Sequence, residues 1–285
     1  MLDYTGKNAE KLKEKTLYLL DMDGTIYNEN EIFDGTLDFL DTIRAQGGEY
    51  IFITNNSSKS VEDYVEKVRK MGIQADKENF YTSSQATAMY LQEQYPGQVV
   101  YCMGTASLVQ ELRQAGIEVV TEADDRATVV LLGFDTENTS EKIRNTCIML
   151  GKDVAYLATN PDLVCPVSFG YIPDCGSMSI MLKNATGKEP FFIGKPEPIM
   201  VNCVLKKRNK RPEEAVIVGD RLYTDIKTGE RAGVDTICVL SGEASMEDIQ
   251  NGEVKPTYIF QSVREIYQGL SRRLTKAGDS TYEIS

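Results

Sequence analysis

Short apolar segments alternate with longer amphipathic segments along most of the chain, and this order limits the folds that are open to it. The segment 16–20 (TLYLL) has the length and composition of a buried strand. A helix pattern follows from Gly35, with Leu37, Leu40 and Ile43 spaced to share one face. Strands that alternate with helices predict a parallel sheet joined by crossover helices, so we expect an α/β fold.

The alternation is interrupted near residues 95–98 (YPGQ), where the sequence indicates a domain break. Two further strand-helix-strand patterns follow, and then a Pro- and Gly-bearing loop at 159–177. The strands expected to belong to the first pattern are 16–20, 49–54 (EYIFIT), 79–83 (NFYTS), 191–194 (FFIG), 215–220 (AVIVGD), 236–240 (TICVL) and 257–260 (TYIF). We therefore expect a core formed by residues 1–95 and 189–285, with a second α/β domain inserted at 96–188.

Polar residues follow four of the predicted core strands at the point where each strand ends. They are Asp21 with Asp23, the segment 54–57 (TNNS), Lys195 and Asp220. In a parallel sheet, ligands bind beyond the carboxyl ends of the strands. If these strands are neighbours, the four groups gather along one edge of the sheet.

The carboxylates of Asp21, Asp23 and Asp220 would repel one another at such an edge unless a cation joined them. The sequence has no histidine, which excludes the Ser-His-Asp triad, the Cys-His dyad and most zinc sites. Oxygen ligands alone favour a hard metal such as Mg²⁺. With Lys195 as a second positive charge and donors in 54–58, the set predicts a phosphoryl-transfer site.

Four short motifs then resemble, in order, those of the haloacid dehalogenase (HAD) superfamily. They are DMDGT (21–25), TNNS (54–57), GKP (194–196) and GDRLYTD (219–225). The insert and its ATNPD segment (158–162) resemble subfamily IIA, the NagD-like or p-nitrophenylphosphatase-like branch with a C2 cap. The resemblance implies a Rossmann-like parallel-sheet core with an inserted α/β C2-type cap.

The resemblance also implies a role for each motif residue. Asp21 would be the nucleophile and Asp23 the general acid/base, while Asp21, the backbone carbonyl of Asp23 and Asp220 would bind Mg²⁺. Asp225 would support the metal waters or orient Lys195, which stabilises the phosphate. The phosphate-binding residues would be Thr54, Asn55, Asn56 and Lys195.

The cap segment carries fewer implications. Asn160 and Asp162 are candidates for substrate contact, but a T-N-P-D run is equally typical of a turn stabilised by its own side chains. The chain has PDCGS (173–177) where the family often has P-G-x-G-S, and it lacks the cap histidine of relatives that act on pyridoxal phosphate.

These features favour a Mg²⁺-dependent phosphatase that hydrolyses small phosphomonoesters through an aspartyl-phosphate. Two alternatives are a phosphotransferase or mutase acting on sugar phosphates, and a regulator that binds a phosphorylated metabolite without turnover. The motifs do not select among phosphoglycolate, a sugar or glycerol phosphate, a nucleotide and pyridoxal phosphate as substrate.

The expected partner is a small phosphorylated metabolite. A net charge of −12 argues against nucleic-acid binding, and no apolar run has the length of a membrane helix. The first residues lack the apolar core of a signal peptide, so a cytoplasmic location with six free thiols is expected. By analogy with capped relatives, a homodimer formed through the cap is a further expectation.

Overall fold

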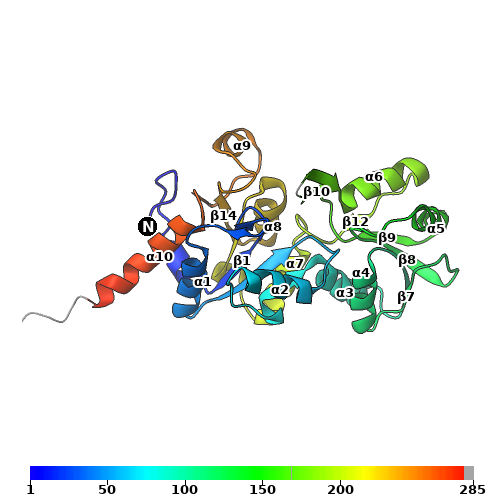
Figure 1. Ribbon diagram of the computed structural model, residues 1–285, viewed down its shortest axis with the longest axis horizontal. Coiled ribbons are helices and arrows are strands. Elements are labelled where there is room, and N and C mark those ends of the chain that lie inside the picture. Colours follow the sequence, from blue (N-terminus) through cyan, green and yellow to red (C-terminus); the bar gives the residue numbers. More distant parts are fainter. Residues whose placement is uncertain (168, 279–285) are drawn as a thin grey trace, which may run out of the picture. The chain divides into compact units, whose positions relative to one another are not determined.

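The computed structural model describes residues 1–167 and 169–278, and these form two compact units (Figure 1). The first unit comprises Met1–Ile53, Glu66–Phe80 and the chain from Val204 onward. The second unit comprises Thr54–Val65 and Tyr81–Cys203.

A six-stranded sheet in the order β15-β14-β13-β1-β4-β5 forms the centre of the first unit. Its strands are β1 (Leu17–Leu20), β4 (Glu49–Thr54), β5 (Phe80–Thr82), β13 (Ala215–Gly219), β14 (Asp235–Val239) and β15 (Tyr258–Phe260). Strand β1 pairs in parallel with β13 on one side and with β4 on the other. All four residues of β1 are buried, which explains its unbroken apolar sequence. The sheet is the parallel α/β architecture that the sequence predicts.

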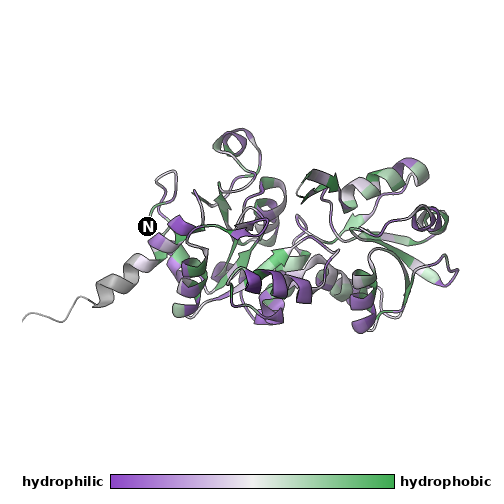
Figure 2. Cartoon of the chain, viewed as in Figure 1, coloured by the Kyte–Doolittle hydropathy of each residue, from purple (hydrophilic) through white to green (hydrophobic). Residues whose placement is uncertain are grey.

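Helices and short turns accompany this sheet, and Figure 2 shows many hydrophilic residues in the helices and mainly hydrophobic residues in the strands. The α-helices are α1 (Thr36–Ala45), α2 (Val61–Lys70), α7 (Ile199–Arg208), α8 (Lys227–Ala232), α9 (Met246–Asn251) and α10 (Val263–Gly278). The other elements are the 3-10 turns η1 (Glu10–Glu14), η2 (Lys77–Asn79) and η3 (Pro212–Glu214), the π-helical turn η4 (Leu222–Ile226), and the hairpin of β2 (Tyr27–Asn28) and β3 (Glu31–Ile32). Helices α2 and α7 each cross a boundary between the units along the chain.

The prediction that Leu37 lies on the apolar face of α1 is wrong. Phe39, Leu40 and Ile43 are buried, but Leu37 is 39% exposed. The physical reason is that Phe39 and Ile43 are four residues apart and share a face, which leaves Leu37 at its margin. The larger aromatic ring of Phe39 occupies the buried position and meets Tyr18 of β1 edge to face.

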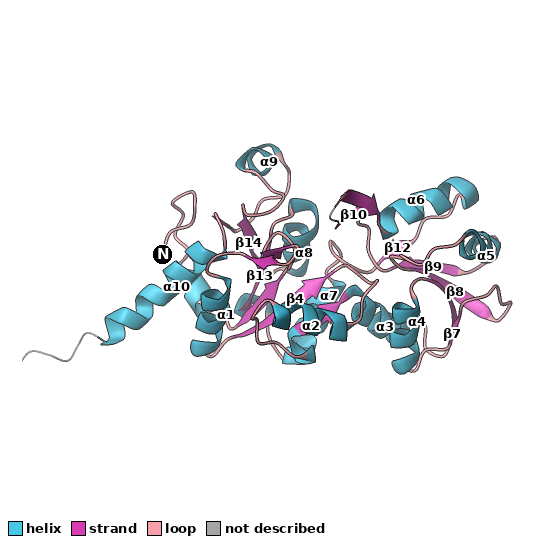
Figure 3. Ribbon diagram, viewed as in Figure 1, coloured by secondary structure: helices cyan, strands magenta, loops and turns pink. Residues whose placement is uncertain are grey.

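The second unit contains a separate sheet in the order β12-β9-β8-β6-β7. Its strands, drawn in magenta in Figure 3, are β6 (Val99–Met103), β7 (Val119–Val120), β8 (Ala127–Leu132), β9 (Ala155–Ala158) and β12 (Phe191–Phe192). Its helices are α3 (Ser83–Gln94), α4 (Ala106–Gln114), α5 (Ser140–Leu150) and α6 (Cys175–Thr186). Strands and helices again alternate, so the predicted strand-helix-strand pairs are confirmed.

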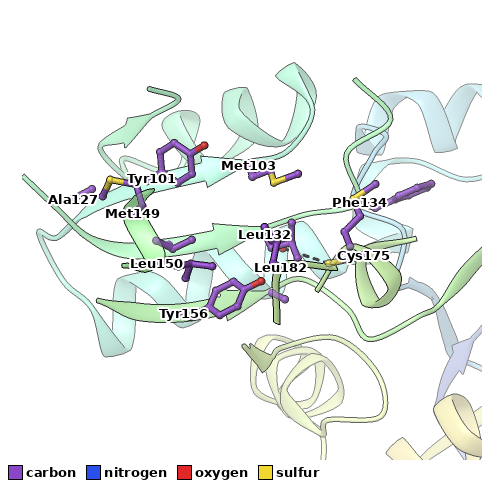
Figure 4. Close-up of a cluster of buried hydrophobic side chains, with 13 residues drawn as sticks. Tyr101, Met103, Ala127, Leu132, Phe134, Met149, Leu150, Tyr156, Cys175 and Leu182 are labelled. Carbon is purple, nitrogen blue, oxygen red and sulfur yellow. Dashed lines mark hydrogen bonds between the residues drawn. The ribbon is translucent and has the colours of Figure 1, made fainter. Parts of the chain in front are cut away.

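A buried cluster holds this second sheet to α5 and α6 (Figure 4). Tyr101 and Leu132 come from neighbouring strands, Leu150 ends α5, and Leu182 lies in α6. The Cys175 thiol at the start of α6 donates to the Leu132 carbonyl at 3.6 Å. Large apolar side chains of this kind stabilise by roughly 1.5–3 kcal/mol each when fully buried.

The strand at 191–194 does not belong to the core sheet, and this prediction is wrong. Phe191 and Phe192 form β12, which pairs in parallel with Leu157 and Ala158 of β9 in the second sheet. The Phe191 ring stacks on Tyr90 of α3 with ring centres 5.6 Å apart, a contact that fixes this short edge strand. The domain boundaries at 95/96 and 188/189 stay a prediction.

The loop predicted at 159–177 contains a two-stranded hairpin. Strands β10 (Val164–Val167) and β11 (Gly170–Pro173) pair antiparallel and form a sheet of their own. Pro166 and Pro173 are typical of a loop, but each strand of a two-stranded ribbon has one edge without a ladder partner, where proline is tolerated. Within residues 1–167 and 169–278, the structure contains no helix that combines the length and apolarity needed to span a bilayer.

Candidate active site

Three carboxylates meet at the carboxyl edge of the sheet in the first unit. Asp21 directly follows β1, and its backbone N–H donates to Val218 of the neighbouring β13 at 2.9 Å. This parallel register brings Asp220, two residues further along, to the same edge. Asp225 follows on η4, and one carboxylate oxygen from each of Asp21, Asp220 and Asp225 lies within 4.8 Å of the others.

The Asp220 carboxylate is buried and only partly satisfied by protein groups. Its Oδ2 accepts a hydrogen bond from the Glu243 backbone N–H at 2.8 Å, while Oδ1 has no hydrogen-bond partner within the described part of the chain. Burial and, secondarily, the nearby Asp225 carboxylate raise the pKa of Asp220 to about 6. A buried, partnerless carboxylate oxygen beside two more carboxylates is the arrangement that a divalent cation would satisfy.

Two glycines line the Asp220 carboxylate, and both are needed for steric reasons. A Cβ atom on Gly24 or Gly242 would overlap the Asp220 side chain. Gly24 also has φ +85°, a backbone conformation that residues with a side chain rarely adopt. The Ser241 hydroxyl donates to the Gly24 carbonyl at 2.8 Å, which ties the loop after β14 to the turn after β1.

Arg221 is the cation nearest to this carboxylate group along the chain. Its Nε lies 2.9 Å from the Glu243 carboxylate, and its backbone N–H donates to Asp225 at 3.2 Å. The negative charges of Asp21, Asp220 and Glu243 raise the pKa of Arg221 against the opposing effect of its burial. Arg221, Gly242 and Glu243 have no predicted role, although the position of 241–244 directly after a predicted core strand is a signal for one.

Asp23 has a more exposed environment than the three clustered carboxylates. Its side chain is 52% exposed and lies 3.8 Å from the Lys67 ammonium group. The Tyr27 hydroxyl donates to Asp23 Oδ2 at 3.5 Å, and Lys67 lies over the Tyr27 ring at 4.0 Å from its centre. The predicted ligand role of Asp23 concerns its backbone carbonyl, which the side-chain cluster does not test.

In the second unit, the TNNS segment is connected to Lys195 through one side chain. The Asn55 Oδ1 accepts from the Lys195 backbone N–H at 2.7 Å, and its Nδ2 donates to the Lys195 carbonyl at 2.9 Å. Lys195 is almost wholly buried. Thr54 accepts from the Asn56 backbone N–H at 3.2 Å, so its own O–H remains able to donate to an oxyanion.

The other residues of this segment are engaged within the second unit. Asn56 accepts from the backbone and hydroxyl of Ser58, a turn closed by its own side chain. The Ser57 hydroxyl is buried, lies 2.9 Å from the Thr159 hydroxyl, and accepts from the Phe134 backbone N–H at 3.0 Å. The segment is therefore held firmly to the ends of β8 and β9.

Asn160 and Asp162 lie next to Asn55. The Asp162 carboxylate accepts from Asn55 at 2.7 Å and from Asn160 at 2.9 Å, and Asn160 donates a second bond to Asp174 at 3.0 Å. Asp174 in turn caps α6 by accepting from the Cys175 backbone N–H. These contacts agree with the turn interpretation of the TNPD run; substrate contact by the two residues stays a prediction.

The structure thus brings the predicted residues together in two sets. The first unit collects Asp21, Asp220 and Asp225, with Asp23 two residues beyond Asp21. The second unit collects Thr54, Asn55, Asn160, Asp162 and Lys195 around the Asn55 side chain. The assigned chemical roles of both sets stay predictions at this point.

Comparison with known families gives two matches along the chain. The family described as haloacid dehalogenase-like hydrolase matches residues 18–118, which include the Asp21 and TNNS motifs. A second family, described as HAD-hydrolase-like, matches residues 192–266, which include Lys195, Asp220 and Asp225. Both sets of site residues therefore fall within matched segments.

Individual relatives match over nearly the whole chain. The acid sugar phosphatase of Staphylococcus aureus is 37% identical over 261 residues, which cover 92% of this chain and 100% of that protein. The crystal structure of a 4-nitrophenylphosphatase from Thermotoga maritima is 35% identical, with a TM-score of 0.87, and covers 92% of this chain and 99% of that one. A glycerol phosphate phosphatase from Mycobacterium tuberculosis, crystallised with magnesium, is 31% identical with a TM-score of 0.85, over 90% of this chain and 77% of that one.

Proposed function

The chain belongs to the haloacid dehalogenase-like hydrolases, in their NagD-like branch, and we propose that it is a Mg²⁺-dependent phosphatase of small phosphomonoesters. The observation that carries this proposal is the cluster of Asp21, Asp220 and Asp225, in which the Oδ1 atom of Asp220 has no hydrogen-bond partner among the described residues. The similar proteins with assigned activities are phosphatases, which supports the same reaction class here.

The residues of the cluster fit a magnesium ion. Asp21 and Asp220 would hold it together with the backbone carbonyl of Asp23, and Asp225 would support its water ligands. All of these donors are oxygen atoms, and Mg²⁺ binds oxygen in preference to nitrogen or sulfur. A related phosphatase was crystallised with magnesium. When bound, such an ion neutralises the clustered carboxylates and lowers the repulsion between Asp21 and a phosphate dianion.

In the first half of the proposed reaction, a carboxylate oxygen of Asp21 attacks the phosphorus atom of the ester. The bond from phosphorus to the alcohol oxygen breaks as the bond to Asp21 forms, and the product on the enzyme is an aspartyl-phosphate. Asp23 donates its proton to the departing alcohol oxygen. The exposed position of the Asp23 carboxylate is compatible with exchange of this proton with water.

In the second half, Asp23 removes a proton from a water molecule as that water attacks the phosphorus of the intermediate. The bond between phosphorus and Asp21 breaks, inorganic phosphate forms, and both carboxyl groups return to their starting states. Thr54, the segment around Asn55 and Asn56, and Lys195 hold the phosphoryl oxygens through donors and positive charge.

The substrates proposed are phosphorylated small molecules, with sugar and glycerol phosphates as the first compounds to examine. The support is the activity named for the similar proteins from Staphylococcus aureus and Mycobacterium tuberculosis. The net charge of −12 makes a nucleic-acid substrate a poor match for the whole molecule.

The test is a phosphate-release assay of the purified chain over a panel of phosphomonoesters, with Mg²⁺ and with EDTA. We expect release from at least one sugar or glycerol phosphate with Mg²⁺ and none with EDTA. Asp21→Asn should abolish release while leaving the melting temperature close to that of the parent. Activity of this variant near the parental level would overturn the nucleophile assignment.

The same assay decides between the proposal and its two alternatives. An isomerised sugar phosphate in place of free phosphate would support a mutase, because the phosphoryl group would then have moved to another hydroxyl. A chain that binds phosphate esters but releases no phosphate from any panel member would support a regulator without turnover.

A homodimer formed through the cap, predicted at residues 96–188, is part of the proposal. Helices α5 and α6 contact each other and expose the apolar side chains of Ile148, Ile180 and Met181. Exposed apolar groups of this kind are typical of protein interfaces. Light scattering of the intact chain should give twice the monomer mass. The cytoplasmic location stays a prediction.

A further inference from the structure

Asn55 uses both ends of its side-chain amide on the backbone of one residue, Lys195. Oδ1 accepts from the Lys195 N–H at 2.7 Å, and Nδ2 donates to the Lys195 carbonyl at 2.9 Å. The Asn55 side chain thus pairs with this residue as a neighbouring β-strand would. A side chain committed in this way has little hydrogen-bonding capacity left for a phosphate oxygen.

The packing around this pair requires a close approach of the two segments. A Cβ atom on Gly194 would overlap Asn55 Oδ1 and the Thr159 carbonyl. The Gly194 backbone N–H donates to that same Thr159 carbonyl at 2.8 Å. The glycine before Lys195 therefore permits the contact with Asn55 in addition to forming part of a recognised motif.

Asn55 is itself held in place from two directions. Its backbone carbonyl accepts from the Ser83 hydroxyl at 2.6 Å, and its Nδ2 also donates to the Asp162 carboxylate at 2.7 Å. Asp162 accepts a further bond from Asn160, which donates to Asp174 at the start of α6. Asn55, Asn160, Asp174 and Lys195 are all buried, so the hydrogen bonds among them are shielded from water, while the two bonds to Asp162 are partly buried.

We propose that Asn55 is a positioning residue for Lys195, and that Asp162 acts with it by fixing the orientation of the Asn55 amide. This inference rests on the proposed function, because it assumes that the Lys195 ammonium stabilises the phosphate. It replaces the expectation that the Asn55 side chain binds phosphate itself. Misplacement of a catalytic group by about 1 Å costs on the order of 100-fold in rate, so the contact has a measurable consequence.

The test is a double-mutant cycle with Asn55→Ala and Lys195→Ala, read as kcat/KM for phosphate release. We expect Asn55→Ala alone to lower kcat/KM by roughly 10- to 100-fold, mainly through kcat. In the Lys195→Ala background, the same change should cost less than about threefold, because the group it positions is gone. Equal losses in both backgrounds would overturn the proposal and indicate direct phosphate binding by Asn55.

Two matched variants separate positioning from loosening of the loop. Asn55→Asp keeps the shape but replaces the Nδ2 donor by an acceptor, so it should fall within the same range as Asn55→Ala. Ser83→Ala removes the hydrogen bond to the Asn55 backbone and leaves the contact with Lys195, so we expect less than about a threefold change. Parental activity of Asn55→Asp would overturn the proposal.

Hydrogen exchange tests the contact independently of catalysis. In Asn55→Ala, the Lys195 amide should exchange faster, while the neighbouring Gly194 amide should stay protected by its bond to Thr159. If the parent releases no phosphate but Asn55→Ala changes exchange in this way, the proposed function is refuted and the contact between Asn55 and Lys195 is supported. Unchanged exchange at Lys195 would refute the contact itself.

Discussion

The Glu243 backbone N–H donates to Asp220 Oδ2 at 2.8 Å, while Oδ1 of that carboxylate has no hydrogen-bond partner in the described ranges. The loop after β14 thus fixes one oxygen atom of a carboxylate that lies within the Asp21, Asp220 and Asp225 cluster. The Asp220 carbonyl is held as well, since it accepts from the Ala244 N–H at 3.0 Å. A carboxylate held on one side only is suited to bind a ligand on the other.

Asp220→Asn should remove the stabilisation of the protein by Mg²⁺. In EDTA the variant should be more stable than the parent, by on the order of 1 kcal/mol, because one of three crowded negative charges is gone. On addition of Mg²⁺, the parent should gain several degrees in melting temperature and the variant almost none. The measurement is thermal unfolding with EDTA and with millimolar Mg²⁺.

Asp248→Asn serves as the control for this comparison. It removes a carboxylate of the same unit that accepts from the Ser245 backbone N–H at the start of α9. The net charge therefore changes by the same amount as in Asp220→Asn. Its melting temperature should rise with Mg²⁺ as much as that of the parent. A Mg²⁺ response of Asp220→Asn equal to the parental one would contradict the proposed metal site.

Gly242→Ala should weaken Mg²⁺ binding without removing any ligand. The added Cβ would overlap the Asp220 carboxylate, so this side chain or the 241–244 loop must shift. We expect the Mg²⁺ concentration for half-maximal activity to rise about 10-fold or more, which is typical of changes beside a metal ligand. Titration of activity with Mg²⁺ measures the effect.

The control is Gly151→Ala at the end of α5, where the backbone is right-handed with φ −70° and only helix carbonyls lie near the added atom. It should leave the Mg²⁺ titration unchanged. Parental Mg²⁺ dependence in Gly242→Ala would mean that the loop adjusts without moving Asp220.

The strands that form the core sheet could be predicted from the sequence because each is buried along its length, apart from the first residue of β4 and of β14. Asp21 and Asp220 could be placed at one edge because β1 and β13 are parallel neighbours, as four paired residues between Leu17–Leu20 and Ala215–Val218 show. The carboxylate cluster therefore followed from strand order and the positions of the two residues.

Other features depend on contacts that no local pattern reveals. The edge strand β12 pairs only two residues with β9, so its sheet could not be chosen from composition. Glu243 contacts Asp220 through its backbone N–H. Every residue except proline has this group, so the identity of residue 243 does not reveal the contact. Asn55 was assigned to phosphate from its motif, whereas its hydrogen bonds to Lys195 depend on a segment 140 residues away.

Stability of the second unit should fall between pH 5 and pH 8 because of Glu111. Burial, with a smaller contribution from the negative charge of Glu62, raises the pKa of this carboxyl group to about 7. A carboxyl whose pKa is raised on folding favours the folded state at low pH and loses that advantage as the pH passes about 7. Glu111→Gln should remove this loss, so its advantage over the parent should grow from pH 5 to pH 8.

The expected gain at pH 8 is on the order of 1–3 kcal/mol, since one pKa unit corresponds to about 1.4 kcal/mol and the group is partly solvated. Chemical denaturation at both pH values measures it. Glu62→Gln should give a smaller gain in the same direction, because it removes only the secondary cause. A pH-independent difference between Glu111→Gln and the parent would contradict the raised pKa.

Three of the six cysteines should resist thiol reagents in the folded protein. All six are free; Cys102, Cys175 and Cys238 are buried, and burial raises the pKa of each of these thiols to about 12. At pH 8 a thiol with a pKa of 12 is ionised in only about one molecule in 10⁴, and the thiolate is the reactive form. Native protein should therefore react with an aromatic disulfide at no more than the three half-buried thiols, whereas urea-unfolded protein should react at all six. Cys165→Ser, in the β10–β11 hairpin, should lower the number of thiols that react in the native protein by one. Cys102→Ser should leave that number unchanged, because Cys102 is buried in β6. A fast reaction of Cys102 in the native protein would contradict the prediction and show that the second sheet opens readily.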